Sequence, residues 1–381
     1  MAAGLVSASA CAGEQPAGTG SPNGVAERPA AVAWHVTPVM KGLDIPWDVE
    51  FLPRGGMLVT ERTKKRLLLR TPAGHVRTLL DGPDFIWESG ETGLMSLAVD
   101  PRFGRNRRIY ACYGATTTGG GHDVRVAAWR LNRARTHVRR IETLVTGMPS
   151  TSGRHGGCRL KISPAGALFI GTGDAATGTN PQDLTSLGGK VLRVNRFTGK
   201  GMPGNPFAQA TNANTRRIYT YGHRNVQGLA WRPGDTMWSV EHGPDRDDEV
   251  NRLVPGGNYG WNPVPGYNES VPMTDLAEFP HAIVAKWSSG FPTVATSGAA
   301  WLSDPRWKSL RGVLAVAALK DSALRLMRFN DANRLVSVRL PAALDGPYGR
   351  LRSVTQGPDG ALYITTANGS TDMVLRAVAV F

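Results

Sequence analysis

Ile162-Ser-Pro-Ala-Gly-Ala-Leu-Phe-Ile170 is the stretch on which the fold prediction depends, because variants of it recur along the chain. Each copy has a hydrophobic residue, then a turn rich in Pro, Gly or Asp, then a short apolar strand. Gln356-Gly-Pro-Asp-Gly-Ala-Leu-Tyr-Ile364 follows it closely, and Phe51–Val59 and Trp231–Ser239 keep the same pattern. A repeat of this kind is typical of a protein built from successive β-sheet units.

Two more copies, at 98–113 and 302–316, carry Asp-Pro-Arg and an aromatic residue in the turn, so the units number six. They lie about 45 to 70 residues apart, and a blade of four short strands needs about 40 residues or more. Strand-like segments at 32–39 and 373–380 could complete one blade together and close the ring. The sequence therefore predicts an all-β fold, a six-bladed β-propeller of four-stranded antiparallel blades over residues 32–381. A multi-sheet sandwich is the alternative.

The composition also favours many short strands over helices, with 46 Gly, 26 Pro and 19% charged residues. A formal net charge of +14 raises the question of nucleic-acid binding. The Lys and Arg residues are scattered, however, and the densest runs, 102–108 and 130–140, are not interleaved with a nucleic-acid-binding motif. We therefore expect no nucleic-acid partner and a solvated basic surface.

Residues 1–31 differ from the rest of the chain, and we interpret them as a signal or lipoprotein remnant followed by a disordered linker. Cys11 ends a run of small residues, which resembles the end of a bacterial lipoprotein signal with Cys11 as the lipidated residue. An incidental cysteine is the alternative, since the apolar run is short. We expect export, with an extracellular, periplasmic or cell-envelope location. No later stretch is long and apolar enough to span a membrane.

Three neighbouring stretches are too polar and too rich in glycine to be scaffold alone. Tyr219–Ala230 places Arg224 and Asn225 beside glycines that permit close backbone approach. Residues 238–251 and 255–261 combine carboxylates, amides and Gly or Pro carbonyls, the hard oxygen ligands that Ca²⁺ prefers. The spacing does not fit an EF-hand loop, so an acidic surface turn remains the alternative.

His155 is followed by two glycines, and Asp174 comes just after the next predicted strand. Such a histidine could act as a base near neutral pH, and Asp174 could orient it. A turn histidine and a strand-capping aspartate are the alternative.

Gly171–Ala176 matches the G-x-G-x-x-A dinucleotide fingerprint. The Thr-Gly-Thr-Asn-Pro that follows is a poor start for the helix that this site requires, so we reject nicotinamide binding.

Together these stretches resemble the soluble PQQ-dependent glucose/sorbosone dehydrogenases, a family of quinoprotein sugar dehydrogenases with six-bladed propellers. The resemblance covers residues 43–366. It rests on six motifs in chain order, which are Gly90–Met95 with Asp100–Phe103, His155–Leu160, Gly222–Leu229, Glu241–Glu249, Gly257–Trp261 and Tyr348–Arg352.

The resemblance implies a set of catalytic residues. His155 would be the general base that takes the proton of a sugar C1 hydroxyl while hydride passes to PQQ. Asp174 would hold this histidine, and Glu91 would line the same pocket. Arg224 and Asn225 would face the quinone oxygens, with Arg224 stabilising the negative charge as the quinone accepts hydride.

The resemblance further implies PQQ and Ca²⁺ as cofactors. PQQ carries three carboxylates, so it needs a cluster of cations. Lys320, Arg350 and Arg352 would supply it; surface charges are the alternative, although Arg350 and Arg352 alternate on a predicted strand and so share one face. The implied calcium ligands are the carbonyls of Gly243 and Pro244 for the ion that anchors PQQ, and Glu249 with the Tyr259 carbonyl for a second, structural ion.

The chain also departs from the family pattern. Arg154 precedes the histidine, where family members can carry an acidic or polar residue, and residues 366–368 lack an acidic group. Cys158 lies inside the histidine motif and could pair with Cys112 if their strands adjoin.

We therefore expect a PQQ- and calcium-dependent aldose dehydrogenase that forms a lactone, with a sugar substrate, an unidentified electron acceptor, and a monomeric or homodimeric state. A non-catalytic cell-envelope propeller that binds glycans or a protein partner is the alternative. A calcium-dependent lactonase propeller is a third possibility, for which the sequence offers too few carboxylates at the central channel.

Overall fold

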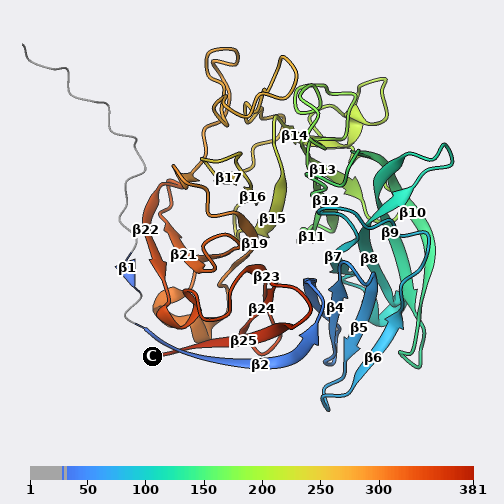
Figure 1. The fold of residues 1–381 in the computed structure, drawn as a ribbon, viewed down its shortest axis with the longest axis vertical. Coiled ribbons are helices and arrows are strands. Elements are labelled where there is room, and N and C mark those ends of the chain that lie inside the picture. Colours follow the sequence, from blue (N-terminus) through green and yellow to red (C-terminus); the bar gives the residue numbers. More distant parts are fainter. Residues whose placement is uncertain (1–27, 30–31) are drawn as a thin grey trace, which may run out of the picture.

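Six antiparallel sheets surround a central axis in the computed structural model, which describes residues 28–29 and 32–381 (Figure 1). The first strand of each blade contacts the first strands of the neighbouring blades, so these six strands form the inner wall of the ring. The predicted six-bladed β-propeller is confirmed. Cys11 lies outside the described residues, and the division between 1–31 and 32–381 stays a prediction.

The strands follow chain order from the axis outward, except in the last blade. Blades 1 to 3 are β3 (Pro46–Phe51), β4 (Met57–Glu61), β5 (Arg66–Arg70), β6 (Val76–Leu80); β7 (Leu94–Val99), β8 (Arg108–Thr116), β9 (His122–Leu131), β10 (Val138–Ser150); and β11 (Arg159–Ile162), β12 (Ala167–Gly171), β13 (Lys190–Asn195), β14 (Ile218–Tyr221). Blades 4 to 6 are β15 (Val226–Trp231), β16 (Met237–Glu241), β17 (Glu249–Arg252), β18 (Trp287–Ser288); β19 (Thr296–Trp301), β20 (Leu314–Ala318), β21 (Leu324–Phe329), β22 (Leu335–Leu340); and β23 (Leu351–Gln356), β24 (Leu362–Thr366), β25 (Asp372–Val380), β2 (Ala33–Leu43).

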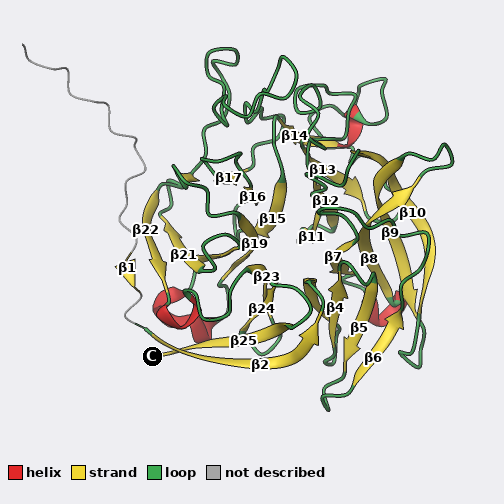
Figure 2. Ribbon diagram, in the orientation of Figure 1, coloured by secondary structure: helices red, strands yellow, loops and turns green. Residues whose placement is uncertain are grey.

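Helices contribute little to the described part of the chain, as Figure 2 shows. They are α1 (Phe103–Asn106) and the 3-10 segments η1 (Thr215–Arg217), η2 (Pro305–Leu310) and η3 (Ala342–Leu344). None of these described helices is long and apolar enough to cross a membrane. A two-residue strand, β1 (Arg28–Pro29), pairs in parallel with β22 at the outer edge of blade 5.

The repeated sequence unit is the connection between the first and second strands of each blade. Gly166, Gly234 and Gly360 adopt φ values of 84°, 76° and 77°, a left-handed conformation that favours glycine and closes a tight turn. The two Asp-Pro-Arg units form α1 and η2 instead. Asp100 and Asp304 each accept a hydrogen bond from a backbone N–H two residues on, at 2.8 and 2.9 Å, which starts a helical turn.

The ring closes in blade 6, where the segments from the two ends of the propeller pair with each other. β2 lies antiparallel to β25, with Ala33 opposite Val380 and Leu43 opposite Asp372. The other three strands of this blade come from the C-terminal part of the chain (Figure 1). The predicted closure by the two terminal segments is confirmed, and it leaves no gap between blades 1 and 6.

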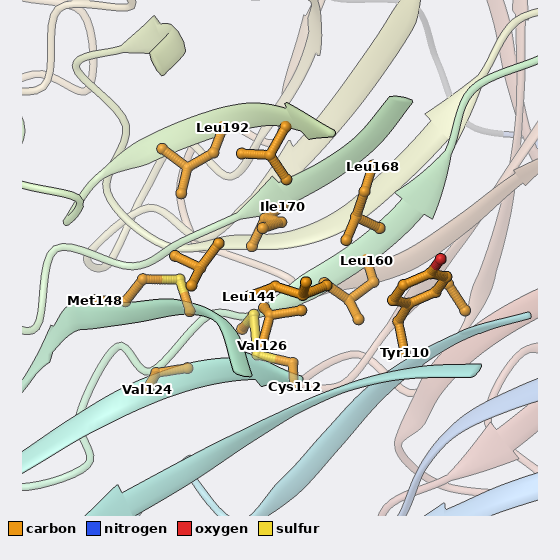
Figure 3. Close-up of a cluster of buried hydrophobic side chains, with 14 of the residues drawn as sticks. Tyr110, Cys112, Val124, Val126, Leu144, Met148, Leu160, Leu168, Ile170 and Leu192 are labelled. Carbon is orange, nitrogen blue, oxygen red and sulfur yellow. A yellow bond between two sulfur atoms is a disulfide. The ribbon is translucent and has the colours of Figure 1, made fainter. Parts of the chain in front are cut away.

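The core lies between neighbouring blades, because second strands such as β12, β16 and β20 are buried on both faces. Figure 3 shows this packing between blades 2 and 3, where Val126 of β9 and Ile170 of β12 belong to one buried cluster. A disulfide joins Cys112 of β8 to Cys158, just before β11, within this cluster. The sequence left this pairing open. The bond links blade 2 directly to the segment that carries His155.

Polar side chains of several first strands contact one another near the central axis. Asp48 on β3 accepts hydrogen bonds from the hydroxyls of Ser96 on β7 and Ser353 on β23, both at 2.6 Å. It also forms an ion pair with Arg159 on β11, with 2.8 Å between Nη1 and Oδ1. The Arg159 guanidinium lies 4.2 Å from the ring centre of Trp47. These contacts tie four blades together at one buried carboxylate.

Candidate active site

The predicted catalytic residues meet at one end of the ring. In a propeller, the start of each first strand and the end of each second strand face the same side. Glu91, His155 and Arg224 lie in the segments that lead into β7, β11 and β15, and Asp174 follows β12. Four segments that are distant in sequence therefore converge around the axis.

His155 and Asp174 form a buried pair, with 2.8 Å between Nδ1 and Oδ1. A carboxylate only accepts, so Nδ1 carries the proton and donates it. Trp261 Nε1 and the Tyr267 hydroxyl each donate to Asp174 Oδ2 at 2.8 Å. The backbone N–H of Ala176 donates to Oδ1, also at 2.8 Å. With four donors, Asp174 is fixed, and the His155 ring is fixed with it; its Nε2 makes no hydrogen bond within the described chain.

The backbone around His155 is held in an unusual conformation. His155 has a φ of 52°, in the left-handed region that few non-glycine residues adopt. Its carbonyl lies so close to Gly173 that a Cβ there would be 1.8 Å from the oxygen. The His155 N–H donates to Glu91 Oε1 at 3.3 Å. A glycine is therefore required beside Asp174 to let the two halves of the pair approach.

Glu91 connects this pair to β15. Its Oε2 accepts hydrogen bonds from Asn225 Nδ2 at 2.9 Å and from Gln227 Nε2 at 3.3 Å. Burial, the largest effect, would raise the pKa of Glu91, but the neighbouring His155 and His242 and the hydrogen bonds from Asn225 and the His155 N–H outweigh it and lower the pKa. Glu91 is therefore an anion at neutral pH, next to the histidine.

Arg224 lies on the other side of the site. Its side chain is 5.6 Å from the ring centre of Trp261, and Nη1 donates to the His242 carbonyl at 3.2 Å. Nη2 forms an ion pair with Glu269, which is also paired with Arg154 Nη2 at 2.7 Å. Burial opposes ionisation of Glu269, but the two arginines outweigh burial and lower the pKa of this carboxyl.

A cavity of about 420 Å³ opens beside these ion pairs. Its lining combines the arginines and Glu269 with the loop after β16: Arg154, Arg224, Pro244, Asp245, Arg246, Glu269 and Ser270. This cavity therefore adjoins the residues expected to bind a cofactor.

The sequence agrees with known proteins over almost its whole length. Residues 43–375 match the Glucose / Sorbosone dehydrogenase family. The chain belongs to this family. Membership makes it an oxidoreductase of the sugar dehydrogenase class.

Individual relatives agree with this assignment. The chain is 32% identical to aldose sugar dehydrogenase YliI of Escherichia coli over 356 residues, which are 91% of this chain and 93% of that protein. A putative oxidoreductase (glucose dehydrogenase) from Thermus thermophilus has 36% identity and a TM-score of 0.77, over 91% of this chain and all of that one. The PQQ-bound aldose sugar dehydrogenase of Streptomyces coelicolor has 27% identity and a TM-score of 0.75, over 91% and 99%.

The family implies PQQ, and the buried cations at this site fit an anionic ligand. Burial, with the nearby cations Arg62, Arg159 and Arg350, lowers the pKa of Arg352 to about 9. Nε of Arg352 and Nε of Arg224 are both buried without a hydrogen-bond partner in the described chain. Buried donors without acceptors are costly, so carboxylate or quinone oxygens in this space would stabilise them.

The other two predicted cations, Arg350 and Lys320, are more exposed than Arg352. Arg350 is exposed, and its Nε donates to the Ala367 carbonyl at 3.1 Å. Lys320 is also exposed, with Nζ 3.4 Å from the Thr293 hydroxyl. Thr293 in turn bonds to the loop after β16, since its N–H donates to the Asp245 carbonyl. Lys320 therefore lies near Pro244, whereas Arg350 lies near Arg352.

The first predicted calcium ligands lie in this loop. Asp248 fixes the turn, because its Oδ1 accepts from the Gly243 N–H at 3.0 Å. The Gly243 and Pro244 carbonyls accept no hydrogen bond from the described residues, and they are oxygens of the kind that Ca²⁺ prefers. No group of three His, Cys, Asp or Glu residues suited to a metal occurs in the described chain. The fit therefore rests on carbonyl ligands.

The second pair of predicted calcium ligands includes a buried acid. Burial and the neighbouring Glu241 raise the pKa of Glu249 well above its ordinary value. Its partners are Asn251 at 3.0 Å and the Thr274 hydroxyl at 3.4 Å, neither of which is a cation. The Tyr259 carbonyl accepts no hydrogen bond in the described chain. A bound cation would compensate the buried carboxylate, so these residues fit the proposed structural ion.

Sequence reasoning gave no role to several residues that complete the site. Tyr267 and Glu269 reach it from a segment without regular structure between β17 and β18. His242 lies inside a quoted motif, and its buried Nε2 has no partner among the described residues. Its position between a glutamate and a Gly-Pro turn was the only available signal. Arg154, read as a departure from the family, pairs with Glu269.

Proposed function

We propose that this protein is a PQQ- and calcium-dependent aldose dehydrogenase that oxidises the C1 hydroxyl of a sugar to a lactone. The observation that carries the proposal is His155, held by Asp174 with its Nε2 free, beside buried arginine nitrogens that lack acceptors. The PQQ-bound aldose sugar dehydrogenase among the similar structures supports the choice of cofactor.

PQQ, when bound, would supply the hydride acceptor. His155 Nε2 takes the proton of the C1 hydroxyl, because Nδ1 is already protonated and bonded to Asp174. The Asp174 carboxylate then stabilises the imidazolium cation that results. Trp261 and Tyr267 keep that carboxylate in place. Burial of the pair excludes water that would compete for the proton.

The surrounding polar groups have separate roles in this proposal. Arg224 and Asn225 would face the quinone oxygens, where the Arg224 cation stabilises developing negative charge. Arg350, Arg352 and Lys320 would pair with the cofactor carboxylates. Ca²⁺ would bind at the carbonyls of Gly243 and Pro244 and, as a structural ion, at Glu249 and the Tyr259 carbonyl. Glu91 would line the sugar side of the pocket.

We further propose that the protein is exported and passes electrons to an acceptor outside the cytoplasm, as a monomer or homodimer. The aldose sugar dehydrogenase relatives support export in general terms. A lipid anchor at Cys11 stays a prediction from the sequence.

A PQQ titration of the purified protein, with calcium and with EDTA, tests the cofactor assignment. We expect saturable binding that requires calcium and weakens at least about tenfold in Arg352→Met, since a charge-assisted hydrogen bond contributes about 1.5–3 kcal/mol. Arg334→Met is the matched control, because Arg334 is an exposed arginine in the turn between β21 and β22. Absence of PQQ binding under all conditions would overturn the proposal and favour a glycan- or protein-binding propeller.

A further inference from the structure

A second cavity lies at the opposite end of the propeller from His155. It has a volume of about 240 Å³ and sits between blades 1 and 2. Its walls come from three connections: residues 52–56 between β3 and β4, α1 between β7 and β8, and residues 132–137 between β9 and β10. His155 precedes a first strand, whereas these connections follow first or third strands. They therefore lie at the end of the propeller opposite to the active site.

Four arginines line this cavity, and no acidic residue does. They are Arg54, Arg107, Arg133 and Arg135. None of the four forms an ion pair with a carboxylate in the part of the chain that the structure describes. The cavity therefore holds several positive charges that no neighbouring side chain compensates.

Two of these guanidinium groups are held in place by backbone carbonyls. Arg107 Nε donates to the Leu131 carbonyl at 3.0 Å, and Arg135 Nη1 donates to the Gly55 carbonyl at 3.5 Å. Each guanidinium has five N–H donors, so most remain available for a ligand. Arg54 and Arg133 are exposed, and their side chains make no hydrogen bond within the described chain. The cavity thus combines two oriented arginines with two free ones.

The backbone at this site is unfavourable for arginine. Arg54, Arg107 and Arg135 have φ values of 65°, 52° and 54°, in the left-handed region. Glycine or asparagine would adopt this conformation more readily than arginine. Three residues with a left-handed backbone conformation, all of them arginines, therefore surround this one cavity.

We propose that this arginine pocket is a binding site for a phosphoryl group, separate from the catalytic site and independent of the proposed function. Guanidinium groups bind phosphate oxygens in pairs, and several of them around one cavity match an anion with two charges and tetrahedral geometry. The basic runs at 102–108 and 130–140 are adjacent here because α1 and the turn at 132–137 both flank β8 and β9. A soluble phosphate compound and a phospholipid headgroup share this chemistry.

Calorimetric titration with inorganic pyrophosphate tests the pocket directly. We expect saturable binding by the wild-type protein that weakens as ionic strength rises. The double variant Arg54→Ser, Arg133→Ser should bind at least about tenfold more weakly, since charge-assisted hydrogen bonds are lost. Both side chains are exposed and unbonded, so the fold is expected to persist; circular dichroism checks it. The control variant is Arg334→Ser, which replaces an exposed arginine in a turn at the same end of the propeller. It should bind pyrophosphate as tightly as the wild type does.

Cosedimentation with vesicles separates the two sources of the phosphoryl group. Binding to phosphatidylglycerol vesicles but not to phosphatidylcholine vesicles, lost in the double variant, assigns the pocket to an anionic lipid headgroup. Binding of pyrophosphate without vesicle binding assigns it to a soluble phosphate compound. The proposal is overturned if the wild type binds neither probe, or if the double variant binds both as well as the Arg334 control.

Discussion

Replacing Asp174 with Asn tests how strongly the site depends on the fixed protonation of His155. Asp174 Oδ1 accepts hydrogen bonds from His155 Nδ1 and the Ala176 N–H, and Oδ2 accepts from Trp261 Nε1 and the Tyr267 hydroxyl. Asn keeps one acceptor oxygen, so two of the four donors lose their partner. If the NH₂ group of Asn faces Trp261, a buried indole N–H is left without an acceptor, which costs about 1–3 kcal/mol. If the NH₂ group faces His155, Nδ1 must accept its hydrogen bond, and the imidazole proton moves to Nε2.

Both orientations remove the negative charge that stabilises protonated His155, and the second also blocks the basic nitrogen. We expect kcat to fall by about 10²- to 10⁴-fold, the usual range for general base catalysis, with little change in KM. The free energy of unfolding should fall by about 1–3 kcal/mol. Dye reduction by the PQQ-loaded variant measures the first effect, and urea denaturation measures the second.

Asp183→Asn is the matched control, since Asp183 is exposed in the same loop and its carboxylate accepts hydrogen bonds from the backbone N–H and the hydroxyl of Thr185. It should retain wild-type kcat. An Asp174→Asn enzyme with wild-type kcat would refute the role given to this carboxylate.

Three other changes have defined outcomes. Replacing Cys112 and Cys158 with Ser opens a loop with a sequence separation of 46 residues, and should lower the free energy of unfolding by about 4 kcal/mol in the chain-entropy model; an unchanged urea midpoint would contradict this. Asp48→Ala leaves Arg159 buried without its partner, and should lower stability by about 3–5 kcal/mol in the same assay, whereas a loss below 1 kcal/mol would argue against a tight axial network. Glu269→Gln frees the arginines that Glu269 pairs with, and should tighten PQQ binding by about three- to tenfold; weaker binding would show that Glu269 supports the cofactor instead. Those arginines lower the pKa of Glu269 although burial raises it. The stabilisation from its charge is therefore present above the ordinary pKa of 4.5 and is lost as the pH falls through the lower pKa of the folded protein. The free energies of unfolding of the wild type and of Glu269→Gln should therefore converge in acid.

The propeller could be predicted from the sequence because its determinants are local. Turn glycines such as Gly166 and Gly360 recur before apolar strands, and each copy marks the connection between the first two strands of a blade. The catalytic residues were implied by the resemblance to a known family. The repeat explains why they meet, since they lie in the segments next to first and second strands, at one end of the ring.

The remaining features depend on contacts between distant segments. Tyr267 lies 112 residues from His155 in the chain, in a segment with no periodic pattern, so no local signal pointed to their contact. The cavity that Arg107 and Arg135 line also depends on such a contact, because α1 and the turn after β9 lie side by side. The pairing of Cys112 with Cys158 likewise required knowledge of which blades adjoin.

Dye reduction by His155→Ala, loaded with PQQ and Ca²⁺ to the same occupancy as the wild type, tests the proposed general base most directly. Occupancy is fixed by absorbance before aldose and dye are added, so a binding defect cannot be mistaken for a catalytic one. We predict turnover by the wild type and a loss of at least about 10²-fold in kcat for His155→Ala. A PQQ-loaded His155→Ala protein that oxidises aldoses at the wild-type rate would contradict the proposed mechanism.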